Sequence, residues 1–298
     1  MVFIKQRSIL SGMLVQEAMR RRVIRVAPEN SLSECINRMI KHKVSAVLVT
    51  EENGKPAGVV SKTDLIGAFY AELPVETASA DIMAGPPLFC FPDDSLESAV
   101  DLMQDSNVHR LYVTGAQSEQ VIGVLAYPDV VGLLYRYCRV CGKSVARARR
   151  DAGDAADGVR LRVGDVMTTS VRACETHDTL ARVIEELMTR RCGAVLIQNA
   201  AGHAAGVISK TDLVIAYKHG EATGTGAGAV MRHPVLSCGT NDYLSEALQQ
   251  MLLKDVQRIF VHGEDPDRMT GVLSLSDSAR FRSGSCRACT PGRLIAGA

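Results

Sequence analysis

A short polar segment that could bind a sugar or a phosphate occurs four times along the chain. The hydroxyl and carboxyl residues of three copies are Ser61, Thr63 and Asp64; Ser209, Thr211 and Asp212; and Ser274, Ser276 and Asp277. The remaining copy keeps Asp129 but has Ala126 and Pro128 in the hydroxyl positions. An ionised Asp can accept hydrogen bonds from two adjacent sugar hydroxyls, and a neighbouring Ser or Thr can donate to a phosphate oxygen.

The same segments also fit the start of a helix, because each follows a predicted strand. Backbone N–H groups at a helix start add positive partial charge that favours an anion. Ser and Asp are also ordinary N-cap residues, which need no ligand. Ligand binding and helix capping therefore both explain the segments, and both can hold at once.

The polar segments belong to a long internal duplication. Ala57–Leu65 (AGVVSKTDL) and Ala205–Leu213 (AGVISKTDL) agree at eight of nine positions and lie 148 residues apart. The same offset relates Val108–Val113 (VHRLYV) to Val256–Val261 (VQRIFV). Such regular self-similarity indicates two halves that are built alike.

Each half is doubled again in a weaker repeat. Every quarter begins with a lead-in segment that ends at a methionine, namely Met19, Met83, Met167 or Met231. An extended stretch and an amphipathic run follow, and residues 32–43 show the helical spacing of apolar residues most clearly. Two apolar runs then flank a polar turn, as in residues 45–61, before the capped helix. The expected order in each quarter is β-α-β-β-α.

Composition limits the classes of protein that remain. The chain has 298 residues, 46% of them hydrophobic, which suggests about two globular domains. The net charge is +1, aromatic residues make up 4%, and Trp is absent. Nucleic-acid binding through the basic run Arg147–Arg150 is thus a weak alternative. Apolar runs are too short for a transmembrane helix or a signal peptide, so we expect a cytoplasmic protein.

The four glycine-led segments resemble those of cystathionine-β-synthase (CBS) domains. They are Gly58–Asp64, Gly123–Asp129, Gly206–Asp212 and Gly271–Asp277, and the resemblance covers residues 15–134 and 163–280. It implies an α/β fold of the α+β CBS type, with four β-α-β-β-α motifs paired into two pseudo-twofold Bateman modules.

The resemblance and the linkers together suggest a division of the chain. The expected parts are a first CBS pair at 1–142 with motifs at about 15–70 and 80–135, a linker at 143–160, and a second pair at 161–298 with motifs at about 163–219 and 229–283. The family resemblance implies clefts for AMP, ADP, ATP or another adenosyl ligand. It also implies a regulatory protein rather than an enzyme, commonly a homodimer that acts on a partner protein.

The resemblance also implies which residues surround each ligand. His109 and Arg110 match a phosphate-contacting pair in the γ subunits of AMP-activated kinases, and Arg258 takes the corresponding place in the fourth copy. The strand starts Val44, Ser45 and Ala46, and Cys192, Gly193 and Ala194, are expected on the adenine side of the Asp129 and Asp277 clefts. The alternative for the basic residues is a solvated position at a helix end.

Two C-x-x-C pairs lie outside this pattern. They are Cys138 and Cys141, and Cys286 and Cys289, again 148 residues apart. Four thiolates could hold Zn or an iron–sulfur cluster. A redox dithiol or a site shared between subunits explains the pairs about equally well, and no special role is the remaining alternative. A metal- or redox-sensing protein that uses the CBS modules as a scaffold is therefore the alternative function. Cys90 and Cys238 are expected in the core.

Overall fold

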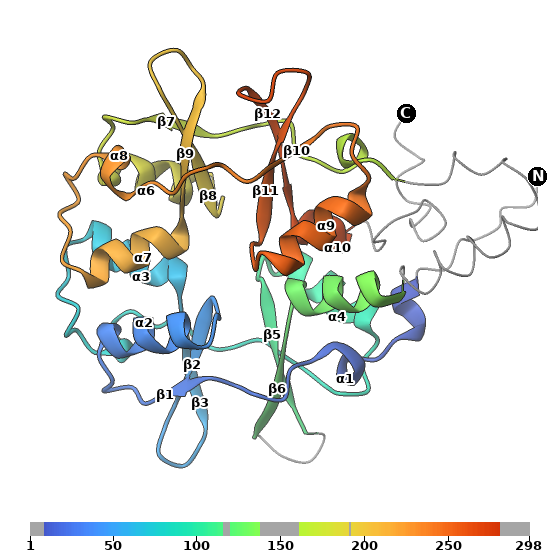
Figure 1. The fold of residues 1–298 in the computed structure, drawn as a ribbon. Coiled ribbons are helices and arrows are strands. Elements are labelled where there is room, and N and C mark those ends of the chain that lie inside the picture. The colour runs from blue at the N-terminus through green and yellow to red at the C-terminus, as the bar shows by residue number, and fades with distance from the viewer. Residues whose placement is uncertain (1–8, 116–119, 138–160, 191, 281–298) are drawn as a thin grey trace, which may run out of the picture.

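The computed structural model describes residues 9–115, 120–137, 161–190 and 192–280 (Figure 1). It holds four three-stranded sheets, in which the first strand pairs parallel with the second and the second pairs antiparallel with the third. In the described part of the chain, no helix is long and apolar enough to cross a lipid bilayer.

Each sheet belongs to one β-α-β-β-α motif, as the sequence predicts. The first motif comprises β1 (Arg25–Val26), α2 (Leu32–Lys41), β2 (Ala46–Thr50), β3 (Pro56–Ser61) and α3 (Lys62–Tyr70). The second comprises β4 (Phe89–Cys90), α4 (Leu96–Asp105), β5 (Arg110–Thr114), β6 (Val121–Ala126) and helical residues 127–137. The third comprises β7 (Ala173–Glu175), α6 (Leu180–Thr189), β8 (Ala194–Gln198), β9 (Ala204–Ser209) and α7 (Lys210–Lys218). The fourth comprises β10 (Ser237–Gly239), α9 (Leu244–Leu253), β11 (Arg258–His262), β12 (Met269–Ser274) and α10 (Leu275–Arg280).

Short helical turns lie in the lead-in segments. They are η1 (Ile9–Gly12), α1 (Val15–Ala18), η2 (Ser79–Asp81), η4 (Val163–Asp165) and α8 (Ala227–Val230). Each lead-in segment crosses to the other motif of its half, since backbone bridges join Arg20 to Val124 and Ala84 to Val59. The second half repeats this exchange, with Thr168 bridged to Val272 and Arg232 to Val207.

The exchanged segments explain why glycine and methionine recur together. A Cβ atom at Gly58 would lie 2.7 Å from the sulfur of Met83, and one at Gly271 would lie 2.6 Å from that of Met167. Gly123 and Gly206 meet the other two methionines in the same way. The glycine that opens each polar segment therefore leaves the space into which the other motif's methionine packs.

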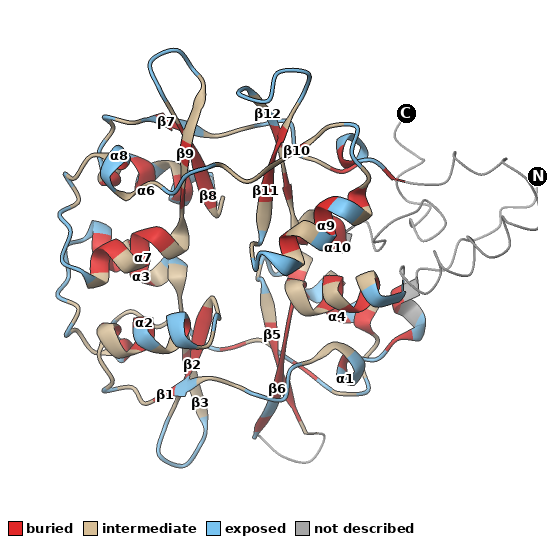
Figure 2. Cartoon of the chain, in the orientation of Figure 1, coloured by how far each residue is buried: buried red, intermediate tan, exposed pale blue. Residues whose placement is uncertain are grey.

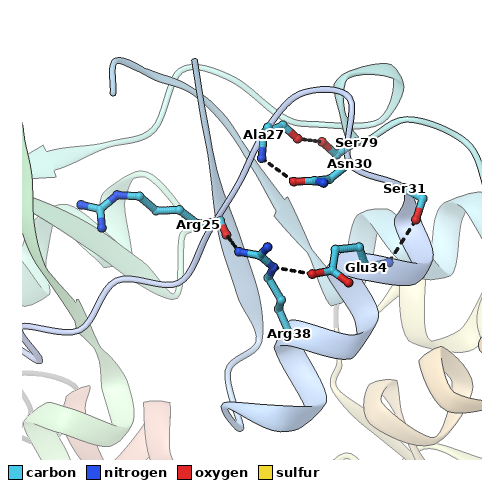
Figure 3. A network of polar contacts seen from close by, with 7 residues as sticks. All are labelled: Arg25, Ala27, Asn30, Ser31, Glu34, Arg38 and Ser79. Atoms are coloured by element: carbon cyan, nitrogen blue, oxygen red, sulfur yellow. Dashed lines mark hydrogen bonds and ion pairs between the residues drawn. The ribbon is translucent and has the colours of Figure 1, made fainter. Parts of the chain in front are cut away.

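Polar contacts fix the first motif to its neighbour's lead-in segment (Figure 3). Ser31 caps α2 by accepting a hydrogen bond of 3.2 Å from the backbone of Glu34, which itself accepts one of 2.7 Å from Arg38. The fully buried hydroxyl of Ser79 donates to the carbonyl of Ala27 over 3.0 Å. The bond of Ser79 satisfies a buried hydroxyl that would otherwise be unpaired, whereas Arg38 and Glu34 are each 40% exposed.

Two kinds of apolar contact hold the motifs together. Within the first half, the sheets meet through buried Leu48, Tyr112, Val121 and Val124. Between the halves, one core joins the first motif to the third and another joins the second to the fourth. Helices α3 and α7 lie side by side in the core that joins the first and third motifs (Figure 1). Buried residues follow the inward faces of helices and strands (Figure 2).

Candidate ligand-binding clefts

All four polar segments lie where the third strand of a motif ends and the next helix begins. In each, the Asp Oδ2 accepts a backbone N–H from three residues earlier. These bonds join Asp64 to Ser61 (2.7 Å), Asp129 to Ala126 (2.9 Å), Asp212 to Ser209 (2.8 Å) and Asp277 to Ser274 (3.0 Å). Helix capping is thus present in every copy, and it uses one carboxylate oxygen, which leaves Oδ1 for another partner.

The four Oδ1 atoms differ in what they contact. Arg20 Nε lies 2.9 Å from Oδ1 of Asp129, and Arg232 Nε donates to Oδ1 of Asp212. In contrast, Oδ1 of Asp64 and of Asp277 accepts no hydrogen bond from a described residue. Two of the four carboxylates are therefore paired with an arginine of the protein, and two keep an oxygen without a partner among the described residues.

The lead-in segments determine this difference. The residue after the repeated methionine is Arg20, Ala84, Thr168 or Arg232, and it lies beside the polar segment of the other motif. Burial raises the pKa of Asp129, and the adjacent guanidinium of Arg20 opposes that rise. An arginine in this position supplies the cation that a buried carboxylate needs.

The first half has a cavity between its two motifs, with a volume of about 270 Å³ that includes space open to solvent. Val44, Ala46, Arg110 and Arg20 are among its lining residues. Arg110 donates to the carbonyl of Ala46 over 3.2 Å and to the hydroxyl of Ser45, so both strand starts meet here. Only about 10 Å³ of this space would admit a water-sized sphere, so the side chains as placed nearly fill the cleft.

Arg258, the counterpart of Arg110 in the second half, has different surroundings. Its guanidinium lies against Gly193, so that a Cβ atom there would come within 2.2–2.5 Å of the guanidinium atoms. In the described part of the chain, Arg258 Nη1 is the one buried side-chain nitrogen or oxygen without a hydrogen-bond partner. Burial lowers the pKa of Arg258, whereas Cys192 and Asp277 favour its charged form. This cleft therefore has an unsatisfied donor that suits an anionic oxygen.

The polar segments of the first and third motifs also contact each other. Lys62 Nζ donates to Thr211 Oγ1 over 2.7 Å, and Lys210 Nζ donates to Thr63 Oγ1 over 2.8 Å. Burial lowers the pKa of both lysines, and a neighbouring arginine lowers each further. The two halves thus share a reciprocal polar contact at their candidate ligand segments.

Comparison with known proteins places the repeat in a family. The family model for the CBS domain matches residues 15–71, 78–136, 163–219 and 227–277. The chain belongs to the CBS domain family.

Individual relatives of this CBS protein are distant. The γ-3 subunit of 5′-AMP-activated protein kinase from Bos taurus is 24% identical over 197 residues, which cover 62% of this chain and 37% of the subunit. Uncharacterized protein MK0525 from Methanopyrus kandleri is 28% identical over 119 residues, which cover 39% of this chain and 60% of that protein. The chain thus matches less than two thirds of either relative. The crystal structure of MJ1225 from Methanocaldococcus jannaschii superposes with a TM-score of 0.73 at 14% identity, covering 89% of this chain and 98% of the other, and shows the same fold.

The residues singled out in the sequence lie near the ends of strands and helices, and the structure joins only some of them by contacts. Ser274 donates to Asp277 Oδ2 over 2.7 Å and lies 2.7 Å from the hydroxyl of Ser276. His109 is exposed, and its ring meets that of Tyr127 edge-on at 5.8 Å, apart from the contacts of Arg110. Ala194 is buried at the start of β8.

The cysteine predictions divide into two groups. Cys90 and Cys238 are core residues, as predicted, and burial raises the pKa of both thiols to about 12. The C-x-x-C residues Cys138, Cys141, Cys286 and Cys289 lie outside the described residues. Among the residues that the structure describes, no group of three or more His, Cys, Asp or Glu side chains could hold a metal ion. A zinc or iron–sulfur site at these cysteines stays a prediction.

Sequence reasoning missed the basic residues that act across motif boundaries. Arg20 and Arg232 directly follow repeated methionines, and Lys62 and Lys210 lie inside the repeated SKTD sequence. The variable position after each methionine was the available signal, but its importance depends on the exchange of lead-in segments. That exchange is visible only in three dimensions.

Proposed function

We propose that this CBS protein is a regulatory sensor that binds AMP, ADP or ATP in clefts between paired motifs. The observation that carries the proposal is the second-half cleft, where Asp277 keeps Oδ1 open and Arg258 keeps a buried N–H unpaired. A ribose diol can donate to the carboxylate, while a phosphate oxygen can accept from the guanidinium. The similarity to a γ subunit of AMP-activated protein kinase supports the same ligand class.

Binding in this cleft would join two motifs. Arg258 begins β11 of the fourth motif, whereas Gly193 immediately precedes β8 of the third. A nucleotide that contacts both holds the strand starts at one separation and so favours one packing of the module. A ligand shifts a conformational equilibrium only through such a difference in affinity between two states.

The contact between Lys210 and Thr63 offers a route from one half to the other. Lys210 begins α7, and its pKa is lowered by burial and then by the charge of Arg258. A phosphate that neutralises Arg258 would reduce this repulsion and strengthen the cationic donor that reaches Thr63. A partner protein that contacts both halves could detect the change. The partner, a homodimer and a cytoplasmic location stay predictions.

The test is calorimetric titration of nucleotide-stripped protein with AMP, repeated with ATP. We expect saturable binding of at least one of them, weakened at least tenfold by Asp277→Ala because the ribose loses its acceptor. Asp267→Ala is a matched control, since Asp267 is exposed in a turn away from the cleft. Absence of binding to the parent protein, or equal affinity of the Asp277→Ala variant, would contradict the proposal.

A further inference from the structure

The first and third motifs provide an internal comparison of two clefts. Their polar segments share the sequence SKTDL, and both aspartates cap their helices through Oδ2. Only Asp212 has a guanidinium at Oδ1, because Arg232 occupies the position that Ala84 holds in the first half. One side chain in the lead-in segment therefore separates two otherwise similar sites.

The backbone that presents this side chain is the same in both clefts. Ala84 and Val59 exchange two hydrogen bonds of 2.9 and 2.7 Å, and Arg232 and Val207 exchange two of 2.9 Å. The remaining pair of clefts shows the same arrangement, with Arg20 bonded to Val124 and Thr168 bonded to Val272. The position after each methionine is thus held at a fixed place beside its aspartate.

We propose that Arg20 and Arg232 are built-in occupants that close the Asp129 and Asp212 clefts to nucleotides. This inference rests on the proposed function and specifies which clefts perform it. An arginine offers only donors, so its guanidinium takes the acceptor oxygen that a ribose hydroxyl would need. The chain then binds two nucleotides, one at Asp64 and one at Asp277.

The carboxylate of each internal pair is buried, whereas its arginine is 65% exposed at Arg232 and 43% exposed at Arg20. The side chain of Asp212 is 5% exposed and that of Asp129 is 11% exposed, so each carboxylate is largely removed from water. A nucleotide that expelled the arginine would replace a charged donor with a neutral hydroxyl, the weaker partner for a buried carboxylate. Each module therefore contains one closed and one open cleft, and the closed clefts are maintained by the protein's own cations.

Reciprocal substitutions between Ala84 and Arg232 test the proposal. The number of AMP molecules bound per chain is measured by equilibrium dialysis and by calorimetry. We expect two for the parent protein, three for Arg232→Ala and one for Ala84→Arg. Thr168→Arg should also reduce the number to one, because it copies Arg20 into the second half. Arg268→Ala is the control, since this side chain is 67% exposed, like the 65% of Arg232, and pairs with Asp265 in a turn.

The outcomes separate this inference from the proposed function. Binding of AMP by the parent with unchanged stoichiometry in both Arg232→Ala and Ala84→Arg would overturn the inference and leave the proposed function intact. No binding by the parent but binding by Arg232→Ala would support the closed cleft and contradict the proposed sensor. No binding by any variant would overturn both. Thermal unfolding of each variant identifies folded protein, and Arg232→Met provides a second opening variant with an unbranched side chain that carries no donor.

Discussion

The guanidinium of Arg258 lies directly against the backbone of Gly193, with no side chain between them. Arg110 occupies the equivalent position in the first half and donates to the hydroxyl of Ser45. The unpaired atom is Arg258 Nη1, whose counterpart in Arg110 donates to the carbonyl of Ala46. The second half also lacks the hydroxymethyl group of Ser45. A buried unpaired donor is costly, so a ligand acceptor that pairs with it contributes more binding free energy here than in the first half.

Restoring that hydroxymethyl group should impair the second-half cleft. In Gly193→Ser, the new Cβ would overlap the guanidinium of Arg258, which must move and can then bond to the added hydroxyl. We expect AMP affinity at the Asp277 cleft to fall about tenfold, or about 1.4 kcal/mol. Calorimetric titration measures the change. Ser45→Gly is the matched control in the first half, and an unaltered affinity in Gly193→Ser would contradict the expected role of Arg258.

The contact between Lys62 and Thr211 should contribute to the association of the halves. Lys62→Met and Thr211→Val each remove one side of a hydrogen bond of 2.7 Å. A double-mutant cycle should give a coupling free energy of about 0.5–1.5 kcal/mol, typical of one hydrogen bond. Urea denaturation of the four proteins supplies the free energies of unfolding. Strict additivity of the two substitutions would show that the contact contributes nothing.

Removal of Arg20 should produce a pH-dependent loss of stability. Burial already raises the pKa of Asp129, and Arg20→Thr removes the cation that opposes this rise. Above its folded-state pKa, Asp129 would be an unpaired buried anion. We expect a loss of about 1–2 kcal/mol at pH 7, a moderate value because the Arg20 side chain is 43% exposed.

The sign of the pH effect follows from proton uptake. In the variant, folded Asp129 binds a proton at a higher pH than the unfolded chain does, so the loss shrinks as pH falls towards the ordinary pKa of 3.8. Denaturation at pH 7 and pH 5 compares the two conditions, with Arg268→Thr as an exposed control. A loss of equal size at both values would indicate missing packing rather than an unpaired charge.

The fit between glycine and methionine predicts a steric effect. In Gly271→Ala, the added methyl would lie 2.6 Å from the sulfur of Met167 and 3.1 Å from the carbonyl of Thr168. We expect a loss of roughly 1–3 kcal/mol, as for other overpacked sites. Gly132→Ala is the control because nothing lies within 4 Å of its new methyl and the residue is helical. Scanning calorimetry should show a lower Tm only for the Gly271 variant.

Much of the fold could be predicted because local patterns determine it. The apolar spacing of Leu32, Cys35, Ile36 and Met39 marks the buried face of α2, and Ser31 caps this helix. The duplication also indicated repeated β-α-β-β-α units. The sequence did not show that lead-in segments exchange between motifs, because that pairing depends on non-local contacts such as Arg20 with Val124 and Ala84 with Val59.

The candidate site was predicted less completely. Asp277 was found from the repeated polar segment and Arg258 from the family resemblance, and the structure places them within electrostatic range of each other. The pairing of Asp129 with Arg20 could not be found in this way, since neither residue is near the other in sequence. Ser45 and Gly193 were treated as equivalent strand starts, although the presence or absence of one hydroxyl changes what the neighbouring arginine can bind.

The contact between Met19 and Gly123 has a consequence for synthesis of the chain on the ribosome. The N-terminal lead-in segment emerges first, yet the surface that it covers is made about 100 residues later. At roughly 5–20 residues per second, this delay is about 5–20 s. During that interval Met19 lacks its packing site on the second motif. The second motif in turn is completed only by a segment that was translated before the first motif.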